Sequence, residues 1–372
     1  MAKRDATLSD MHDLVIVGAG PSGSVAALRG RQLGASVLLL DRAEFPRPRT
    51  CAGWISPAGV AFAQQCGMKP NRCGAVEFNG LTLHTWDLKK HATIDDSELG
   101  CWAVDRAAFD QALVKLAVEA GAHWFAALQP ERITLRDDRI ELSMADGRTA
   151  TARMLLVADG CESATARLAG IVAAGGLPVV PECTFFETTL DKPASALDVF
   201  LMPGRGAGLA SLVRCGKQAR LTIFSRETGA AAAQSTQALL TALRQNGLVP
   251  AGANLSPTRH KLPLGSALEL ETHIGKRSLL IGNAGGFVAA FSGEGVYPAM
   301  QSGWVAAECA VRAAQAKLPQ DELASFAQAW RCAFGDYLRP PNTDLAMLLP
   351  LVFSNGQMSK RVARAFLLGQ PF

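Results

Sequence analysis

A glycine-rich loop that directly follows an apolar strand constrains this fold more than any other segment. Residues 13–17 (DLVIV) predict a buried strand, and the loop GAGPSG, which ends at Gly23, follows it immediately. Glycine is required in such a loop because the turn is tight, the backbone must approach a pyrophosphate closely, and the next helix packs against the strand. Residues 24–33 predict that helix, and residues 36–40 predict a second strand that ends at Asp41. This order predicts a βαβ unit that binds a dinucleotide, with Asp41 accepting hydrogen bonds from a ribose; a glycine-rich turn without a ligand is the alternative.

A second loop lies within residues 155–167 (LLVADGCESATAR). An apolar strand ends there in Asp159 and Gly160, and Ser163 follows. The segment has two interpretations, an Asp-Gly turn whose serine caps a helix or a further part of the ligand site.

A third loop, residues 279–295 (LLIGNAGGFVAAFSGEG), carries glycines between an apolar strand and a long alanine-rich helix. The first turn of such a helix points free backbone N–H groups and the positive end of the helix dipole at any electron-rich group. A flexible linker is the alternative, but a linker would not be flanked by a core strand and a long helix.

Together the three loops resemble the FAD-binding fingerprints of the glutathione-reductase-like flavoproteins. The narrower resemblance is to the group that holds p-hydroxybenzoate hydroxylase, geranylgeranyl reductases and flavin-dependent halogenases. There the first loop binds the ADP half of FAD, the second is the "DG" motif, and the third is the "GD" motif, G-D-A-x(9)-G-x-G, whose spacing is matched here by Gly282, Gly293 and Gly295. The resemblance implies FAD as cofactor, and as its binding residues Gly18, Gly20, Pro21, Ser22, Gly23, Asp41, Arg42, Arg49, Cys51, Arg106, Asp159, Gly282, Asn283, Gly293, Glu294, Gly295 and Val296.

Two finer features resemble the geranylgeranyl-reductase-like branch. The loop FPRPRTCAG, which contains Cys51, is similar to F-P-R-x-K-x-C-G-G, and SGEGVY, which contains Glu294, is similar to T-G-E-G-I-Y. The stretch VDRAAFD matches a family pattern that places Arg106 near the phosphates or ribitol of the cofactor.

The chain also departs from the family. Asn283 replaces the aspartate of the GD motif, which keeps a hydrogen-bonding group and removes a negative charge. Ala290 stands where a proline is usual. The W-x-W-x-I-P motif of halogenases is missing, and so is the Y-x-W-x-F-P segment of geranylgeranyl reductases, so an isoprenoid substrate is not secured.

Three residues are candidates for catalysis. Cys51 lies by resemblance in a loop that faces the isoalloxazine ring, where it would act as proton donor or redox thiol; simple packing is the alternative. Trp54 would line a substrate pocket or belong to the core, and Glu294 would relay protons or cap a helix. Arg205 is a weaker candidate for meeting an anionic substrate. The glycines at 293 and 295 would stabilise negative charge on the reduced ring.

The predicted fold is α/β (α+β overall), a Rossmann-like FAD-binding domain with an inserted, mostly antiparallel substrate domain and a helical C-terminal tail. Four short strands (CTFFETTL, LDVFLM, GLASLV and ARLTIF) and one helix dominate the inserted module, whose apolar side chains we expect to form the floor of a substrate pocket. The predicted segments are 1–75, 101–178 and 269–318 for the FAD domain, 76–100 and 179–268 for the substrate domain, and 319–372 for the C-terminal helices.

Composition excludes several other classes. Lys and Arg number 37 against 33 Asp and Glu, and a net charge of +4 over 372 residues is too weak to indicate a nucleic-acid partner. The nine cysteines form no C-x-x-C pair, so we expect no disulfide framework, no metal site and a reducing, cytoplasmic location. We expect no signal peptide, and the apolar run Leu345–Phe353 is far shorter than the roughly 20 residues of a membrane span.

Three functions remain open. The first is an FAD-dependent reductase or dehydrogenase acting on an apolar, unsaturated or aromatic small molecule. The second is a single-component monooxygenase, and the third is a non-catalytic flavin electron carrier. No second glycine loop for a nicotinamide cofactor is visible, so NAD(P)H would dock transiently or a reductase partner would supply electrons. The C-terminal segment 345–368, apolar with the basic residues Lys360, Arg361 and Arg364, could also meet a carrier protein or a membrane surface; a helix packed on its own domain is the alternative.

Overall fold

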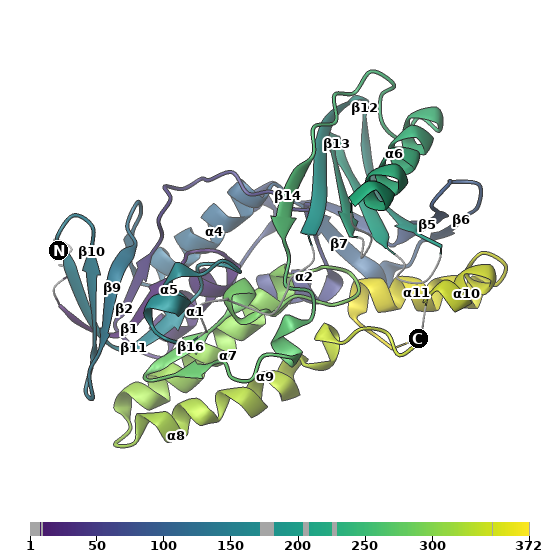
Figure 1. Cartoon of the computed structure of the whole chain (residues 1–372). Helices are drawn as coiled ribbons and strands as arrows, with labels where there is room; N and C mark the ends of the chain where they lie inside the picture. Colours follow the sequence, from purple (N-terminus) through teal and green to yellow (C-terminus); the bar gives the residue numbers. More distant parts are fainter. Residues whose placement is uncertain are drawn as a thin grey trace.

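The computed structural model describes residues 8, 10–171, 182–203, 208–224, 229–343 and 345–371, and its first sheet confirms the predicted α/β class (Figure 1). Five strands of this sheet run parallel in the order β16, β11, β1, β2 and β8, and three further strands join with antiparallel pairing. The strands are β1 (Met11–Val17), β2 (Val37–Leu40), β8 (His123–Phe125), β9 (Pro130–Leu135), β10 (Ile140–Met144), β11 (Thr149–Val157), β15 (Ile274–Gly275) and β16 (Ser278–Leu280).

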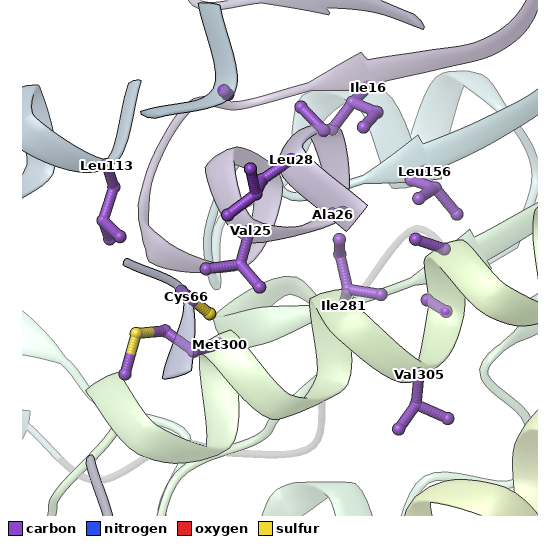
Figure 2. Close-up of a cluster of buried hydrophobic side chains, with 14 of the residues drawn as sticks. Ile16, Val25, Ala26, Leu28, Cys66, Leu113, Leu156, Ile281, Met300 and Val305 are labelled. Carbon is purple, nitrogen blue, oxygen red and sulfur yellow. The ribbon is translucent and has the colours of Figure 1, made fainter. Parts of the chain in front are cut away.

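The main core lies where helices α1 (Pro21–Gln32) and α7 (Val296–Gln315) pack against this sheet and against each other. Figure 2 shows side chains of the strands, α1 and α7 meeting in one cluster that includes Ile16, Val25 and Met300. Each such aliphatic side chain contributes about 1.5–3 kcal/mol when fully buried. Helix α4 (Arg106–Glu119) adds the predicted face of Phe109, Leu113, Leu116 and Ala117, all of them buried.

The second sheet is antiparallel apart from one pair, and it differs from the prediction in strand length. The four short strands predicted for this module are wrong, because they join into two long strands, β12 (Glu182–Leu201) and β13 (Leu209–Phe224). The pairing shifts register between Thr189 and Ala194, opposite Gly216, which adopts φ +56°. Residues 190–193 of β12 therefore form a bulge within a continuous ladder and do not separate two strands.

A third, small sheet connects the two larger ones. It contains β3 (Trp54–Ile55), β7 (Gly100–Ala103) and β4 (Val76–Asn79), whereas β5 (Leu81–Thr85) and β6 (His91–Ile94) join the second sheet together with β14 (Thr258–Lys261). The chain leaves one sheet for the other at Gly80, where φ is +74° and a Cβ would lie 1.9 Å from the Ile94 carbonyl oxygen. The predicted domain boundaries remain a proposal.

The remaining helices cover the sheets and form the C-terminal part (Figure 1). Among the described residues, no helix combines the length and apolar character that a membrane span requires. The helices are α2 (Pro57–Gln65), α3 (Pro70–Cys73), α5 (Ala164–Leu168), α6 (Gly229–Gln245), α8 (Pro319–Ala324), α9 (Phe326–Phe334), α10 (Leu345–Val352) and α11 (Gly356–Leu368), with the 3-10 turns η1 (Ser97–Leu99), η2 (Ser266–Leu268), η3 (Gly282–Gly285) and η4 (Asp336–Leu338).

His273 fastens η3 to the helical layer. Its Nε2 lies 2.9 Å from the carbonyl oxygen of Gly285, which requires that nitrogen to donate, and its ring packs on Phe287 and Trp330 at 4.8 and 5.4 Å between centroids. Burial lowers the pKa of His273 to about 4, although the hydrogen bond to Gly285 opposes this shift. The native state therefore holds this ring neutral.

We predict that His273 makes the protein sensitive to acid. Because its pKa is lower in the folded than in the unfolded chain, its contribution is complete above about pH 6.5 and is lost as the pH falls through 4. Between pH 7 and 5 the loss is on the order of 2 kcal/mol. Denaturant unfolding at both pH values should show a smaller loss in His273→Gln, which keeps a donor for Gly285. An equal loss in both proteins would contradict the assignment.

Candidate active site

The three glycines of the first loop have two different steric roles. A Cβ on Gly18, where φ is +104°, would lie 2.3 Å from the Ala158 carbonyl oxygen, and one on Gly23 would lie 1.8 Å from the carbonyl oxygen of Gly18. A Cβ on Gly20 would instead meet, among the described residues, a single atom within 4 Å, the Arg47 Nη2 at 3.7 Å. Two glycines thus close the loop onto its neighbours, and the third leaves open space at the start of α1.

The start of α1 offers backbone donors to that space. Gly20 is the N-cap and provides no side chain, and the following Pro21 and Ser22 bring no acidic group into the first turn. The first N–H groups of a helix have no partner within the helix, and the helix dipole adds positive potential there. This end of α1 can therefore hold an anionic group such as a phosphate.

Asp41 braces the same loop. Its Oδ2 accepts a 2.8 Å hydrogen bond from the Ala19 N–H, and its Oδ1 accepts one of 2.9 Å from the Ala43 N–H. Each carboxylate oxygen can accept a second hydrogen bond. The predicted contact to a ribose thus stays a prediction, and so does that of Arg42, which is exposed beside Asp41.

Positive charge gathers next to the loop at the start of α4. Arg106 donates through Nε and Nη2 to the two carboxylate oxygens of Asp110, at 3.0 and 3.2 Å, and through Nη1 to the Cys51 sulfur at 3.3 Å. Arg47 lies 3.7 Å from Asp110 and 3.9 Å from the buried Asp41, and its buried Nε has no hydrogen-bond partner among the described residues. Arg49 is exposed and adds a third guanidinium at the same point. Positive charge thus exceeds negative charge at this point, as binding of an anion requires.

A cavity of about 360 Å³ opens beside these arginines. Arg49 faces it and forms no hydrogen bond or ion pair with any described residue. Arg220 of β13 reaches in from the antiparallel sheet, donating to the Val104 carbonyl oxygen at 3.1 Å and to Glu187 at 3.2 Å. The cavity therefore lies between the two modules, lined by Pro46, Pro48, Arg49, Thr50, Cys51, Gly53, Asp105, Arg106, Ala107, Glu187 and Arg220.

Sequence reasoning did not single out Asp110, Arg220 or Glu187. The role of Asp110 could have been predicted, because it lies one helical turn after Arg106 within VDRAAFD. The sequence contains no indication of the role of Arg220, because its partner Val104 is 116 residues away and the two meet only through the fold.

The second loop fits the capping interpretation. The Thr165 N–H donates to Asp159 Oδ2 at 3.0 Å, Ser163 Oγ donates to Oδ1, and Ser163 in turn caps α5 by accepting from the Ala166 N–H at 2.8 Å. This second loop also packs against the first glycine loop, because the Asp159 nitrogen lies 2.7 Å from where a Cβ on Gly18 would be. A direct contact of Asp159 to the cofactor stays a prediction.

The third loop meets the first one. A Cβ on Gly282 would lie 2.4 Å from Ser22 Oγ, and Asn283 Oδ1 lies 3.6 Å from where a Cβ on Gly295 would be. The half-buried Asn283 amide forms no hydrogen bond within the described chain. The structure therefore brings the three loops together, with this amide and the start of α7 on the same side.

Glu294 is buried and caps α7. Its Oε1 accepts hydrogen bonds from the N–H groups of Val296 and Tyr297 at 3.0 and 2.9 Å, and Tyr337 donates to Oε2 at 3.3 Å. Burial raises the pKa of Glu294 to about 7, although the hydrogen bonds and the charge of Arg106 oppose this shift. The capping interpretation describes its contacts, and a role in proton transfer is compatible with them.

Two other candidates lie elsewhere. Trp54 is 4% exposed and stacks on Phe366 of α11 with ring centroids 5.2 Å apart, so the structure places it in the core beside the antiparallel sheet. Arg205 lies outside the described residues.

These residues fit FAD by their steric and chemical character. The open face of Gly20 leaves room for a diphosphate, and the unpartnered Arg47 Nε and the free Arg49 supply positive charge. The unpaired Asn283 amide can meet a ribityl hydroxyl or a phosphate, and the start of α7 can receive the polar edge of a ring. The set therefore suits a dinucleotide with one electron-rich ring.

We predict that two glycine substitutions in one loop have opposite consequences. Gly20→Ala should fold normally but bind FAD at least about tenfold more weakly, because its Cβ fills the space left for a phosphate. Gly23→Ala should cost about 2–3 kcal/mol of stability, because its Cβ collides with the Gly18 carbonyl. Thermal unfolding of the FAD-free proteins and fluorescence titration with FAD separate the two effects. Unchanged FAD affinity in a folded Gly20→Ala would contradict this placement of the diphosphate.

Comparisons with solved structures agree with the fold. A geranylgeranyl bacteriochlorophyll reductase-like protein from Thermoplasma acidophilum superposes with a TM-score of 0.74 at 17% identity, covering 97% of this chain and 98% of that one. A flavin-dependent brominase superposes with a TM-score of 0.70 at 15% identity, covering 96% and 93%. At these identities the likeness concerns the fold alone.

Comparisons of sequence are more specific. The chain is 28% identical to a digeranylgeranylglycerophospholipid reductase 2 from Methanosphaera stadtmanae, over 81% of this chain and 78% of the relative. It is 27% identical to a menaquinone reductase from Mycobacterium tuberculosis, over 81% and 77%. The family model for the FAD binding domain matches residues 11–303. The chain therefore belongs to the FAD-binding domain family and is an FAD-dependent oxidoreductase.

Proposed function

We propose that this oxidoreductase is a reductase of carbon–carbon double bonds in an apolar, isoprenoid-type substrate. The relatives named above support the reductase class, since one is named a digeranylgeranylglycerophospholipid reductase and the other a menaquinone reductase. When bound, FAD supplies the two-electron chemistry of such a reaction. The chain must provide a binding site for the apolar substrate, a proton donor, and groups that balance the charge at the cofactor site.

The observation that carries the substrate class is an apolar cluster that reaches the third loop. Leu197, Val199 and Val213 of the antiparallel sheet face α10 and α11 in this cluster, which also contains Phe224 and Phe291. The Phe224 ring lies against Gly293, so closely that a Cβ there would be 2.5 Å from its Cζ. Apolar surface therefore extends from the second module to the start of α7.

The expected pocket floor is thus closed in this structure. The apolar faces of β12 and β13 pack under α11 and α6, so they do not line either described cavity. Two apolar side chains of α10 are exposed, Met347 at 76% and Leu351 at 48%. We propose that a long apolar substrate enters beside α10 and displaces contacts of this cluster.

We further propose how the chain holds FAD. Gly20 and the start of α1 face the diphosphate, with Arg47, Arg49 and Arg106 supplying positive charge. Asp41 accepts from the adenosine ribose, Asn283 meets the ribityl chain or a phosphate, and the first turn of α7 faces the ring. The other predicted contacts, at Gly18, Pro21, Ser22, Gly23, Arg42, Asp159, Gly282, Gly293, Glu294, Gly295 and Val296, complete or support this site.

Cys51 is the proposed proton donor to the substrate. Its sulfur lies at the wall of the cavity between the modules, 3.3 Å from Arg106 Nη1. Loss of the thiol proton leaves a thiolate, which the guanidinium of Arg106 stabilises at that distance. The cavity is open to solvent from which the thiol regains its proton. The electron donor is NAD(P)H docking transiently or a reductase partner.

We predict that Cys51→Ser slows the reaction without preventing FAD binding. A serine hydroxyl is a far weaker acid than a thiol, and loss of a general acid costs roughly 10²–10⁴ in rate. The FAD-loaded protein is reduced without air, mixed with menaquinone or a geranylgeranyl lipid, and followed by flavin absorbance and product mass. Cys332→Ser is the matched control, because Cys332 is exposed on α9.

The three outcomes separate the functions. A saturated product formed without air, slowly by Cys51→Ser and normally by Cys332→Ser, supports the reductase. An oxygenated product that forms only in air would identify a monooxygenase. Electron transfer to quinones or proteins with no change in any alkene would identify an electron carrier.

A further inference from the structure

The carboxylate of Glu294 occupies the backbone donors at the start of α7. Its Oε1 accepts from Val296 and Tyr297, the first N–H groups of the helix. These are the groups that the FAD site requires to face the ring, and this inference rests on that site but not on the identity of the substrate. A second negative charge arriving there must compete with the carboxylate for the same donors.

Among the described residues, one side chain is hydrogen-bonded to the Glu294 carboxylate and can exchange a proton with it. The residue is 4% exposed, and its other oxygen, Oε2, receives the Tyr337 hydroxyl at 3.3 Å. Tyr337 belongs to η4, far along the chain, and its hydroxyl is also hydrogen-bonded by Ser56. Among the described residues, Tyr337 is the side chain that touches Oε2 by a hydrogen bond.

Tyr337 in turn borders a cavity of about 240 Å³ between the third loop and the C-terminal segment. Ser292, which accepts a 3.2 Å hydrogen bond from the Glu294 N–H, borders the same cavity. Polar side chains at its wall, Asp336, Arg339 and Asn342, suit water. Tyr337 therefore links the wall of this cavity to the buried carboxylate through its hydroxyl group.

We propose that Glu294 takes up one proton when negative charge arrives at the start of α7, and that Tyr337 delivers this proton from the cavity. The Tyr337 O–H bond breaks as an O–H bond forms on Glu294 Oε2, and a solvent molecule in the cavity returns a proton to the Tyr337 oxygen. The phenol is unchanged at the end, and the carboxylate has become a neutral acid that no longer competes for the helix donors.

The charges around Glu294 agree with this role. Arg106 of α4 favours the carboxylate, whereas Cys101 of β7, Tyr297 of α7 and Tyr337 of η4 are neutral neighbours. Burial raises the pKa of Glu294 to about 7, which leaves the group close to half-protonated at neutral pH. A modest increase in nearby negative charge is then enough to protonate it.

The first test needs no cofactor. Because the pKa of Glu294 is higher in the folded than in the unfolded chain, the FAD-free protein should lose stability as the pH rises from about 4.5 to 7. Between pH 5.5 and 8 the unfolding constant of wild type should rise about 25-fold more than that of Glu294→Gln. The difference between the two proteins cancels the opposite contribution of His273. Equal pH profiles would overturn the proposal.

The second test measures how many protons the FAD-loaded protein takes up when it is reduced. At pH 8, anaerobic reduction of the FAD-loaded wild type in a pH-indicator solution should take up close to one proton more than reduction of Glu294→Gln. Tyr337→Phe should take up the same number as wild type but at least about tenfold more slowly, since it removes the O–H that a relay step needs. Tyr297→Phe, the chain's other tyrosine, should behave like wild type. Equal proton counts in wild type and Glu294→Gln would contradict the proposal, and equal rates in Tyr337→Phe would remove the relay.

Infrared difference spectra on reduction keep the test decisive if Glu294→Gln does not fold. Wild type at pH 8 should gain a carboxylic acid C=O band, and no such band would overturn the proposal. None of these three measurements uses a substrate. Failure of alkene reduction would therefore leave the proton uptake intact, and failure of proton uptake would leave the reductase proposal standing.

Discussion

Close contact between backbones, made possible by glycine, organises this molecule. Gly23 of α1 lies against the carbonyl of Gly18, and Gly303 of α7 lies so near α1 that a Cβ would be 2.1 Å from the Ser22 carbonyl oxygen. Gly282 approaches the side chain of the same serine. Through these contacts, loops more than 100 residues apart meet around the start of α1. Side chains at these positions would collide with the neighbouring backbone, push the helices apart and disrupt the site.

Charge is distributed around this junction in two ways. Near the cavity, Arg47, Arg49 and Arg106 face two buried aspartates, Asp41 and Asp110, so one positive charge is left for an anionic ligand. At the start of α7 the positive potential of the helix is already balanced by Glu294. The first arrangement suits a permanent anion such as a diphosphate, and the second suits a charge that appears and disappears during a redox cycle.

Local patterns in the sequence predicted much of the fold, and non-local pairing explains what they missed. The βαβ unit, the apolar face of α4 and the order of the glycine loops follow from residues close together in the chain. The length of β12 and β13 did not, because the residues of the bulge at 190–193 have the composition of a turn. Arg220 and the stacking of Trp54 on Phe366 depend on partners that the sequence does not reveal.

In the proposed reaction, electrons pass to a carbon–carbon double bond and oxygen is not a reactant. The most direct measurement is the mass of the product after turnover with menaquinone or a geranylgeranyl lipid in D₂O under ¹⁸O₂. We predict a product that has gained two hydrogen atoms, as deuterium from the solvent, across the former double bond and carries no ¹⁸O. A product that contains ¹⁸O and keeps its double bond would contradict it.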